Sequence, residues 1–322
     1  MTTSTSPDVI EHVIGPAGEL NLRLHAGDVS LRGVEGGTVR IRDVDGNDLA
    51  ERFTVEAADG RLSLHPRGRF LIDFGFGLAG FGRAVQLSVE VPAGARIHLD
   101  TASASIHGTG LRGEQRYRTA SGSIDLDAAA GEIAIDAVSG SVDLRVDGDV
   151  GLSGRAVSGD VTVRGGRLRS LALSLTSGDV ELESDIAGPG PYGVQTVSGD
   201  VSVTSGQGLR VEARTITGDV SSDLGHRSES VRGQHVLTIG DGRTPFSFKS
   251  ISGDLRVGPA GAARSRAGQA SPVTPAVEPE TGPDPASQDR SAERLAILRE
   301  LEEGTIDIEA ASARLAELED AG

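Results

Sequence analysis

One short phrase recurs along the middle of this chain and constrains its fold more than any other feature. Most copies read Ser-Gly-Asp or Ser-Gly-Ser followed by Val or Ile. The central glycines are separated by 18, 19, 19, 21 and 19 residues, and they are Gly122, Gly140, Gly159, Gly178, Gly199 and Gly218. A fixed period of about 19 residues predicts an architecture of stacked repeats.

Each period contains two short segments in which apolar and polar residues alternate. Leu171, Leu173 and Leu175 form one such segment, and Val180 and Leu182 form the next. Alternation with a period of two is typical of strands with one buried face. The glycine can take a positive φ, and Ser and Asp are common turn residues, so the phrase predicts a tight turn between two strands. Stacked coils of this kind predict an all-β fold, a β-solenoid with repeats of about 19 residues.

The repeat continues beyond its regular copies. A degenerate copy begins at Thr101, another begins at Ser250, and an outlying one reads His25-Ala-Gly-Asp-Val. We therefore expect a solenoid over residues 96–258 and a leading β-layer, continuous with it, over residues 8–95. A separate small β-sandwich is the alternative for the leading segment. Residues 1–7 are expected to be disordered.

The phrases also support a resemblance to a known family. Val89-Glu-Val-Pro-Ala-Gly leads into Asp100-Thr-Ala-Ser-Ala-Ser-Ile, and the serial Val-Ser-Gly-Asp-Val phrases follow. In these features the chain resembles a bacterial family of β-strand-repeat proteins of unknown function that is labelled "putative adhesin". The resemblance covers roughly residues 20–257 and implies the β-repeat fold.

The C-terminal part has a different composition. Six prolines among Gly, Ser and Ala predict a flexible linker over residues 259–290. Beyond it, cap and stop residues predict a helical hairpin over residues 291–322. This segment resembles the short bihelical modules related to the SHOCT domain, which implies self-association or contact with a protein partner. Its candidate contact residues are Leu295, Leu298, Leu301, Ile308, Leu315 and Leu318.

Charge and composition exclude several classes of function. The formal net charge of -16 opposes binding to nucleic acid and to anionic lipid. The absence of Cys excludes thiolate zinc sites and thiol nucleophiles. Residues 1–14 lack the features of a signal peptide, and no apolar run reaches the length of a membrane span, so a cytoplasmic location is expected.

Two patterns are candidates for chemistry. An Asp follows the phrase glycine in five copies, and such a column can bind Ca²⁺ through oxygen ligands, but ordinary turn chemistry explains it more simply. The seven His show no metal-ligand spacing and are expected on the solvated surface. We therefore assign no catalytic, metal-binding or cofactor-binding residue. The aspartates of the column are Asp160, Asp179, Asp200, Asp219 and Asp254.

A Phe/Gly-rich segment separates two of the leading strands. It can form an exposed loop that contacts a partner or a membrane. The alternative, which we favour, is a hairpin that covers the open end of the solenoid. The segment remains the best single candidate for a contact site, and its phenylalanines are Phe70, Phe74, Phe76 and Phe81.

Together these features predict a non-enzymatic β-repeat scaffold or binding module with a tethered helical hairpin for interaction. The evenly spread acids argue against an enzyme, since glycosidase chemistry needs a specific carboxylate pair. A carbohydrate-active β-helix enzyme and an exported adhesin are the alternatives.

Overall fold

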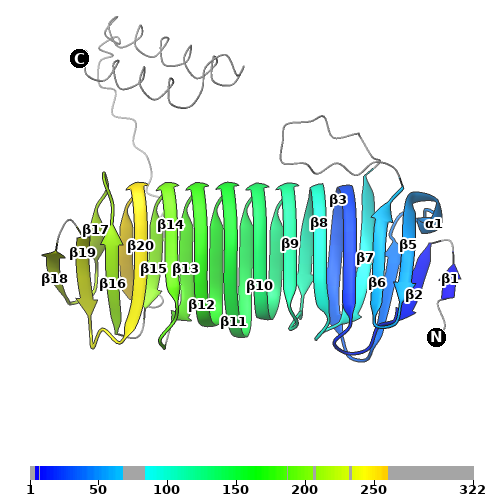
Figure 1. The fold of residues 1–322 in the computed structure, drawn as a ribbon, viewed down its shortest axis with the longest axis horizontal. Coiled ribbons are helices and arrows are strands. Elements are labelled where there is room, and N and C mark those ends of the chain that lie inside the picture. Colours follow the sequence, from blue (N-terminus) through cyan, green and yellow to red (C-terminus); the bar gives the residue numbers. More distant parts are fainter. Residues whose placement is uncertain are drawn as a thin grey trace, which may run out of the picture. The chain divides into compact units, whose positions relative to one another are not determined.

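A computed structural model describes residues 4–6, 8–67, 84–186, 188–205, 208–231 and 234–259. Within this part of the chain the strands join into one 21-stranded sheet, which winds into an elongated body (Figure 1). Its helix is α1 (Leu49–Arg52), a single turn capped by Asp48, whose Oδ1 accepts the N–H of Ala50. No helix among these residues is long and apolar enough to cross a membrane.

The strands in the middle of the body follow the repeat phrase. Long strands such as β10 bend midway, where the register to the next strand shifts near Ala129, so one strand contributes to both sides of the body. The middle strands are β8 (Arg96–Thr109), β9 (Gln115–Ser121), β10 (Ile124–Ser139), β11 (Val142–Ser158), β12 (Val161–Ser177), β13 (Val180–Ile186), β14 (Tyr192–Ser198) and β15 (Val201–Ser205).

Neighbouring coils pair in parallel, one repeat apart. Ile124 pairs with Val142, and Val142 in turn pairs with Val161. Val161 then pairs with Val180, which pairs with Val201. Each phrase therefore lies beside the phrase of the next coil, and the prediction of stacked β-repeats with a period of about 19 residues is confirmed.

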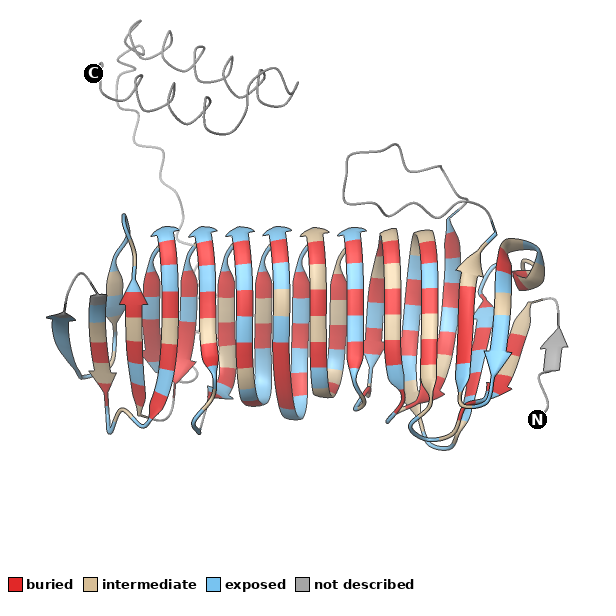
Figure 2. Ribbon diagram, in the orientation of Figure 1, coloured by how far each residue is buried: buried red, intermediate tan, exposed pale blue. Residues whose placement is uncertain are grey.

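Every coil has two outer faces that meet at the turn containing the phrase glycine. Face A is formed by the segments that follow this turn, such as β13 and β15, and face B by the segments that precede it, such as β9 and β14. Side chains alternate between the interior and the surface along each strand, as the coloured bands in Figure 2 show. In β14, for example, Tyr192 and Val194 are buried whereas Gln195 is exposed. The inward side chains, mainly Val, Leu and Ile, form one hydrophobic cluster.

The N-terminal strands continue this sheet. β3 pairs in parallel with β8, and Gly27 lies opposite Ala104, so the outlying phrase at His25 is in register with the repeats. The N-terminal strands and the coils therefore belong to the same sheet. The strands are β1 (Ser4–Ser6), β2 (Val9–Val13), β3 (Glu19–Val34), β4 (Thr38–Asp43), β5 (Phe53–Ala58), β6 (Arg61–Pro66) and β7 (Val85–Pro92).

Two expectations for the N-terminal region differ from the structure. Disorder is expected over residues 1–7, but Ser4–Ser6 forms β1, which pairs antiparallel with β2 because the edge of β2 offers free N–H and C=O groups. His12 is expected on the surface but is buried, with its Nε2 atom 2.8 Å from the carbonyl oxygen of Ala58. His12 and Ile10 are the two buried residues of β2, and a backbone carbonyl takes the place of water as the partner of the ring.

At the C-terminal end the spatial order of the strands departs from their order in sequence. β20 lies between β14 and β16, and β21 lies between β15 and β17. The last phrase, at Gly253, is thus inserted between those at Gly199 and Gly218. The strands of this end are β16 (Leu209–Arg214), β17 (Val220–Ser222), β18 (His226–Val231), β19 (Gln234–Ile239), β20 (Thr244–Ser252) and β21 (Leu255–Pro259).

Antiparallel strands complete both ends of the parallel stack. At the N-terminal end β4 pairs antiparallel with β2 and β7, and β5 with β6. At the C-terminal end β19 pairs antiparallel with β16 and β18. The flanking segments therefore cover the ends of the coils, as edge strands that would otherwise be open require.

Candidate functional site

The phrase glycines stack along one edge of the body, which we call the turn edge. At Gly178 φ is +124° and at Gly199 it is +138°, and side chains disfavour this conformation. A Cβ atom on Gly178 would also lie against the carbonyl oxygen of Gly159, and one on Gly199 against that of Gly178. Glycine is thus required here both by backbone conformation and by the close approach of stacked turns.

Five aspartates form a ladder on the face A side of the turn edge, which we call the Asp ladder. The backbone N–H of Asp179 donates to Oδ1 of Asp160 at 2.9 Å, and that of Asp200 to Oδ1 of Asp179 at 2.8 Å. The same bond joins Asp254 to Asp200 at 2.9 Å and Asp219 to Asp254 at 2.7 Å. The carboxylates therefore satisfy turn N–H groups of the next coil, which agrees with the interpretation of the column as turn chemistry.

A shallow groove of about 530 Å³ lies on face A beside the Asp ladder. Among the residues that the structure describes, no group of three or more His, Cys, Asp or Glu side chains is arranged to hold a metal ion. The groove is an open, mainly acidic surface, and its polar lining residues are Asp160, Thr162, Asp179, Glu181, Asp200, Ser202, Ser221, Asp254 and Arg256.

Arginines on face A pair with acids of adjacent coils. Arg164 Nη2 lies 2.8 Å from Glu181 Oε2, and its Nε lies 3.2 Å from Glu183 Oε2. On the opposite side its Nη1 lies 3.8 Å from Asp143 Oδ1. These pairs are exposed to solvent, so each contributes at most about 1 kcal/mol. Their effect is to balance charge from coil to coil.

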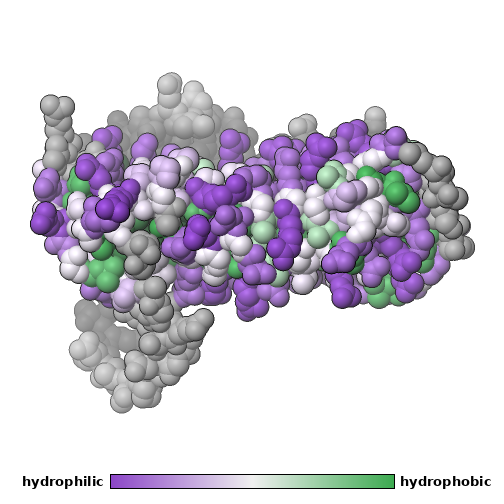
Figure 3. Space-filling model, turned by 90° about the horizontal axis from the view of Figure 1, so that it is seen from below, coloured by the Kyte–Doolittle hydropathy of each residue, from purple (hydrophilic) through white to green (hydrophobic). Residues whose placement is uncertain are grey.

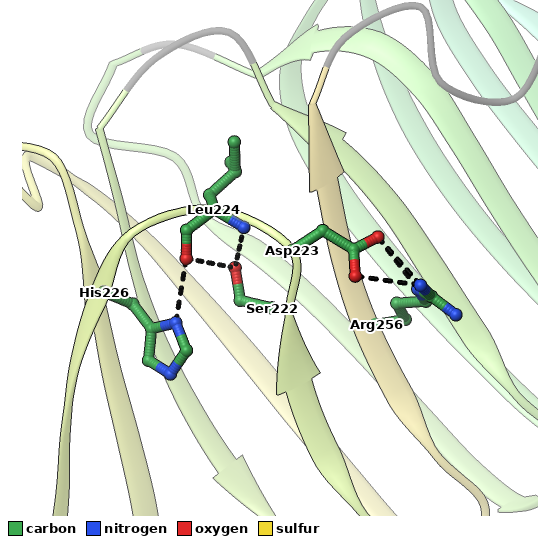
Figure 4. A network of polar contacts seen from close by, with 5 residues as sticks. All are labelled: Ser222, Asp223, Leu224, His226 and Arg256. Carbon is green, nitrogen blue, oxygen red and sulfur yellow. Dashed lines mark hydrogen bonds and ion pairs between the residues drawn. The ribbon is translucent and has the colours of Figure 1, made fainter.

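A polar network connects two strands at the C-terminal end of face A (Figure 4). Arg256 on β21 donates through Nη2 to Asp223 Oδ1 at 2.8 Å and through Nε to Oδ2 at 3.1 Å. These hydrogen bonds raise the pKa of Arg256 above its ordinary value. In the same turn Ser222 Oγ accepts a hydrogen bond from the N–H of Leu224 at 3.1 Å. The network holds the loop after β17 against β21.

Face B carries a different pattern beside the turn edge. The residue two positions before each phrase glycine points outward, and from Gly140 onward it is Val or Ile except before Gly178, where it is Thr176. Four of these side chains are 51%, 44%, 50% and 77% exposed, and they are Val157, Val197, Ile251 and Ile216. With Val138 and Thr176 they form what we call the apolar row, whose order along the stack is Val138, Val157, Thr176, Val197, Ile251 and Ile216.

A second row on face B runs parallel to the apolar row, two residues earlier in each strand. Arg155 pairs with Ser174, and Ser174 with Gln195. Lys249 pairs with Gln195 on one side and with Arg214 on the other. From Arg155 to Arg214 this row, which we call the basic row, contains three cations, and the next position beyond Arg155 is the acid Asp136.

Comparisons with known proteins bear on the C-terminal coils. A family model described as Toastrack DUF4097 matches residues 155–258. Over these residues the chain is similar to the Toastrack family. The matched region includes the aspartates of the Asp ladder and the basic row. No curated protein matches the chain.

Several solved structures are similar to this chain at low identity. A "putative cell adhesion protein" from Clostridium sporogenes is 13% identical and covers 79% of this chain and all of its own, with a TM-score of 0.24. A "putative adhesin" from Bacteroides fragilis is 14% identical over 78% of this chain and 98% of its own (TM-score 0.31). A "Putative lipid binding protein" from Parabacteroides distasonis is 13% identical over 80% and 98% (TM-score 0.40). These values identify neither a ligand nor an activity for this chain.

A buried polar pair lies outside the Toastrack-like region. Tyr117 on β9 is fully buried and donates to Gln115 Oε1 at 3.0 Å, and burial raises the pKa of its hydroxyl. The amide of Gln115 in turn donates to the carbonyl oxygen of Ala130 at 3.0 Å. The phenol is thus a neutral, hydrogen-bonded core group rather than a nucleophile.

The contact residues predicted from the sequence lie outside the described residues, so the structure neither brings them together nor separates them. The sequence nevertheless contains a signal for the apolar row. Two residues before the phrase glycines, where alternation predicts a solvent-facing residue, the Toastrack-like region has Val, Thr or Ile. The predicted residues concerned are Phe70, Phe74, Phe76, Phe81, Leu295, Leu298, Leu301, Ile308, Leu315 and Leu318.

Proposed function

We propose that this protein is a non-enzymatic β-repeat scaffold that binds a protein partner and carries residues 291–322 as a tethered interaction segment. The observation that carries the proposal is the periodicity of the surface. The five coils with an Asp place that Asp and the phrase glycine at matching positions, and four of the five place an outward Val or Ile two residues before the glycine. A surface repeated at about 4.8 Å suits extended contact with a partner.

The environments of the aspartates in the Asp ladder support a binding role rather than catalysis. General acid and base catalysis needs two titratable groups in different environments. The aspartates of the Asp ladder have equivalent environments, because each of four carboxylates accepts the N–H of the next turn. We place the protein in the cytoplasm, with self-association or partner capture through residues 291–322 and no contact with nucleic acid.

The test compares the full chain with a deletion of residues 286–322 in light scattering and in pull-downs. The deletion should lower self-association or remove a partner while leaving the melting temperature of the β-body unchanged. A matched pair of single variants is Leu298→Ser, which removes an apolar contact residue, and Glu300→Gln, which does not.

The outcome that contradicts the proposal is equal mass for both chains at every concentration together with the same set of captured proteins. Hydrolysis of a polysaccharide by the purified full chain would favour the enzyme alternative instead.

A further inference from the structure

The antiparallel strands that cover the C-terminal coils leave an edge of their own. β18 pairs with β19 along its whole length, and none of the other described strands pairs with it. Figure 1 shows β18 at the outer end of the body, with no strand drawn beyond it. An edge strand presents backbone N–H and C=O groups that can pair with a further strand. The sheet can therefore be extended at β18.

The surface of this edge is polar. Four consecutive residues of β18, Arg227 to Ser230, are exposed, whereas Leu237 and Ile239 on the neighbouring strand β19 are buried. The side of the body drawn in Figure 3 is similar in character, since its hydrophobic residues lie in separate patches between hydrophilic ones. A partner of β18 is therefore expected to bind through backbone hydrogen bonds and charged pairs rather than through an apolar surface.

The charges of β18 complement a second copy of the same strand. Arg227 and Glu229 lie on either side of Ser228. When two β18 strands run antiparallel with Ser228 opposite Ser228, Arg227 of each copy lies opposite Glu229 of the other. This alignment forms two equivalent ion pairs. Opposite charges at facing positions of an antiparallel pair stabilise it, whereas like charges there destabilise it.

The two charged side chains of β18 are available for such pairs. Arg210 on β16 lies on the same outer face and is paired with Glu212, with 3.2 Å between Nε and Oε1. Thr238 and Val236 on β19 separate that pair from Arg227 and Glu229. Neither Arg227 nor Glu229 forms an ion pair with another residue in the part of the chain that the structure describes. Their charges can therefore be met by a second molecule.

The open edge at the N-terminal end lacks this complementarity. There β5 pairs with β6, and the charged residue of β5 is Glu56. Two copies of β5 offer each other no cation, and β5 against β18 of another copy matches at most one charged pair. Such head-to-tail contact would continue from copy to copy, whereas contact between two β18 strands closes after two copies. The sequences of the two edges therefore favour a two-fold pair.

We propose that two copies of this chain associate through β18 as an antiparallel pair of strands with Ser228 on the two-fold axis. The axis is perpendicular to the sheet, so face B of both copies lies on the same side. The periodic surface of the proposed scaffold is thereby continued in a second body, without any part for residues 291–322. The association is weak, because one short strand pair is smaller than the interfaces of about 1,200–2,000 Å² that stable complexes bury.

The sequence allows a direct test of this register, because the chain contains no Cys. Ser228→Cys places one thiol on each side of the axis, where facing residues have Cα atoms about 4.5–5.5 Å apart. Disulfides form at this separation. Oxidation of the full-length variant by air and copper phenanthroline should therefore give a disulfide-linked dimer on a non-reducing gel. Salt at about 0.15 M screens the repulsion between chains of net charge -16 beyond about 8 Å.

Two matched variants at exposed serines are the controls. Ser230→Cys lies on the same strand, but in this register it faces His226, so the two thiols are about 13 Å apart along the strand. Ser202→Cys lies on face A and measures random collision. Both should give only the small amount of dimer that collision produces. Circular dichroism melts of all three variants check that the body remains folded.

Charge reversal tests whether the ion pairs hold the two strands together. In the Ser228→Cys chain, Arg227→Glu turns both pairs into facing carboxylates and should lower the dimer yield on the order of tenfold. Adding Glu229→Arg to that variant recreates two pairs of opposite charge and returns the net charge to its original value. The dimer yield should then recover.

A dimer yield from Ser228→Cys no higher than that from Ser202→Cys would overturn the proposal. An equal or higher yield from Ser230→Cys would overturn it as well, since the strands would then pair in another register or by collision. A yield that does not respond to Arg227→Glu would have the same consequence. Deletion of residues 286–322, which tests the proposed function, leaves β18 intact, so the two proposals fail separately.

Discussion

The two sides of the turn edge show how one repeated phrase produces two kinds of surface. On the face A side, four of the five carboxylates of the Asp ladder accept a backbone N–H, so the fold itself requires an acceptor at those positions. On the face B side, the outward side chain two residues before the glycine bonds to nothing in the turn, and it varies from Val to Thr to Ile. Structure therefore determines the first position and leaves the second free to vary.

The largest effect is expected from the glycines that separate the two sides. Gly199→Val places a branched side chain at φ +138° and against the carbonyl oxygen of Gly178. Backbone strain alone costs about 1–3 kcal/mol, and displacement of the neighbouring turn adds to it. Thermal melting of Gly199→Val should show a large drop in midpoint. Gly225→Val, where an added Cβ meets no atom within 4 Å, is the control; equal melting of both variants would contradict the stacking argument.

A smaller effect is expected within the Asp ladder. Asp200→Ala removes the acceptor for the N–H of Asp254, at 2.9 Å in the structure, and an unmade hydrogen bond of this kind costs about 1 kcal/mol. Asp200→Asn retains an oxygen acceptor and should lose less stability. Urea unfolding midpoints of the two variants measure the difference. If alanine were tolerated as well as asparagine, the ladder would have no role in stability.

Substitutions in the apolar row should have little effect on stability. Ile216→Ser and Ile251→Ser lie on exposed positions, so each should change the free energy of unfolding by no more than about 0.5 kcal/mol. Circular dichroism melts of the two variants and of the unchanged chain measure this effect. A drop in stability as large as that of Gly199→Val would show that the row is part of the core.

The smallest expected effect is that of calcium. Each ladder oxygen that accepts an N–H has one fewer free electron pair for a cation, so excess Ca²⁺ should leave the melting temperature unchanged. A specific site would raise the midpoint by mass action. Scans with Mg²⁺ at equal ionic strength are the control, and a rise with Ca²⁺ alone would establish a binding site on face A.

Much of the fold follows from the sequence because the phrase specifies turn, register and buried face together. The stacking of Val142 on Ile124 is a direct consequence of the period. The position of the last coil could not be predicted in the same way, since Leu255 matches the buried column at any level of the stack. Only the pairing of β20 with both β14 and β16 decides it.

The candidate site was less accessible to sequence reasoning. The Asp ladder could be recognised because five aspartates share one position in the phrase. The apolar row was missed because exposed Val and Ile look like ordinary strand residues until register shows that Val197 and Ile251 are neighbours. The basic row was hidden for the same reason, since its three cations lie 35 or more residues apart in sequence.

The insertion of β20 and β21 has a consequence for synthesis of the chain. β16 and β17 reach the rest of the body through β20 and β21, so residues 209–222 cannot join the stack until residues 244–259 have been made. Coils up to Ser205 can add in the order in which a ribosome produces them. The final two coils must then assemble as one unit, and a nascent chain stopped before Thr244 would end in an uncovered strand edge.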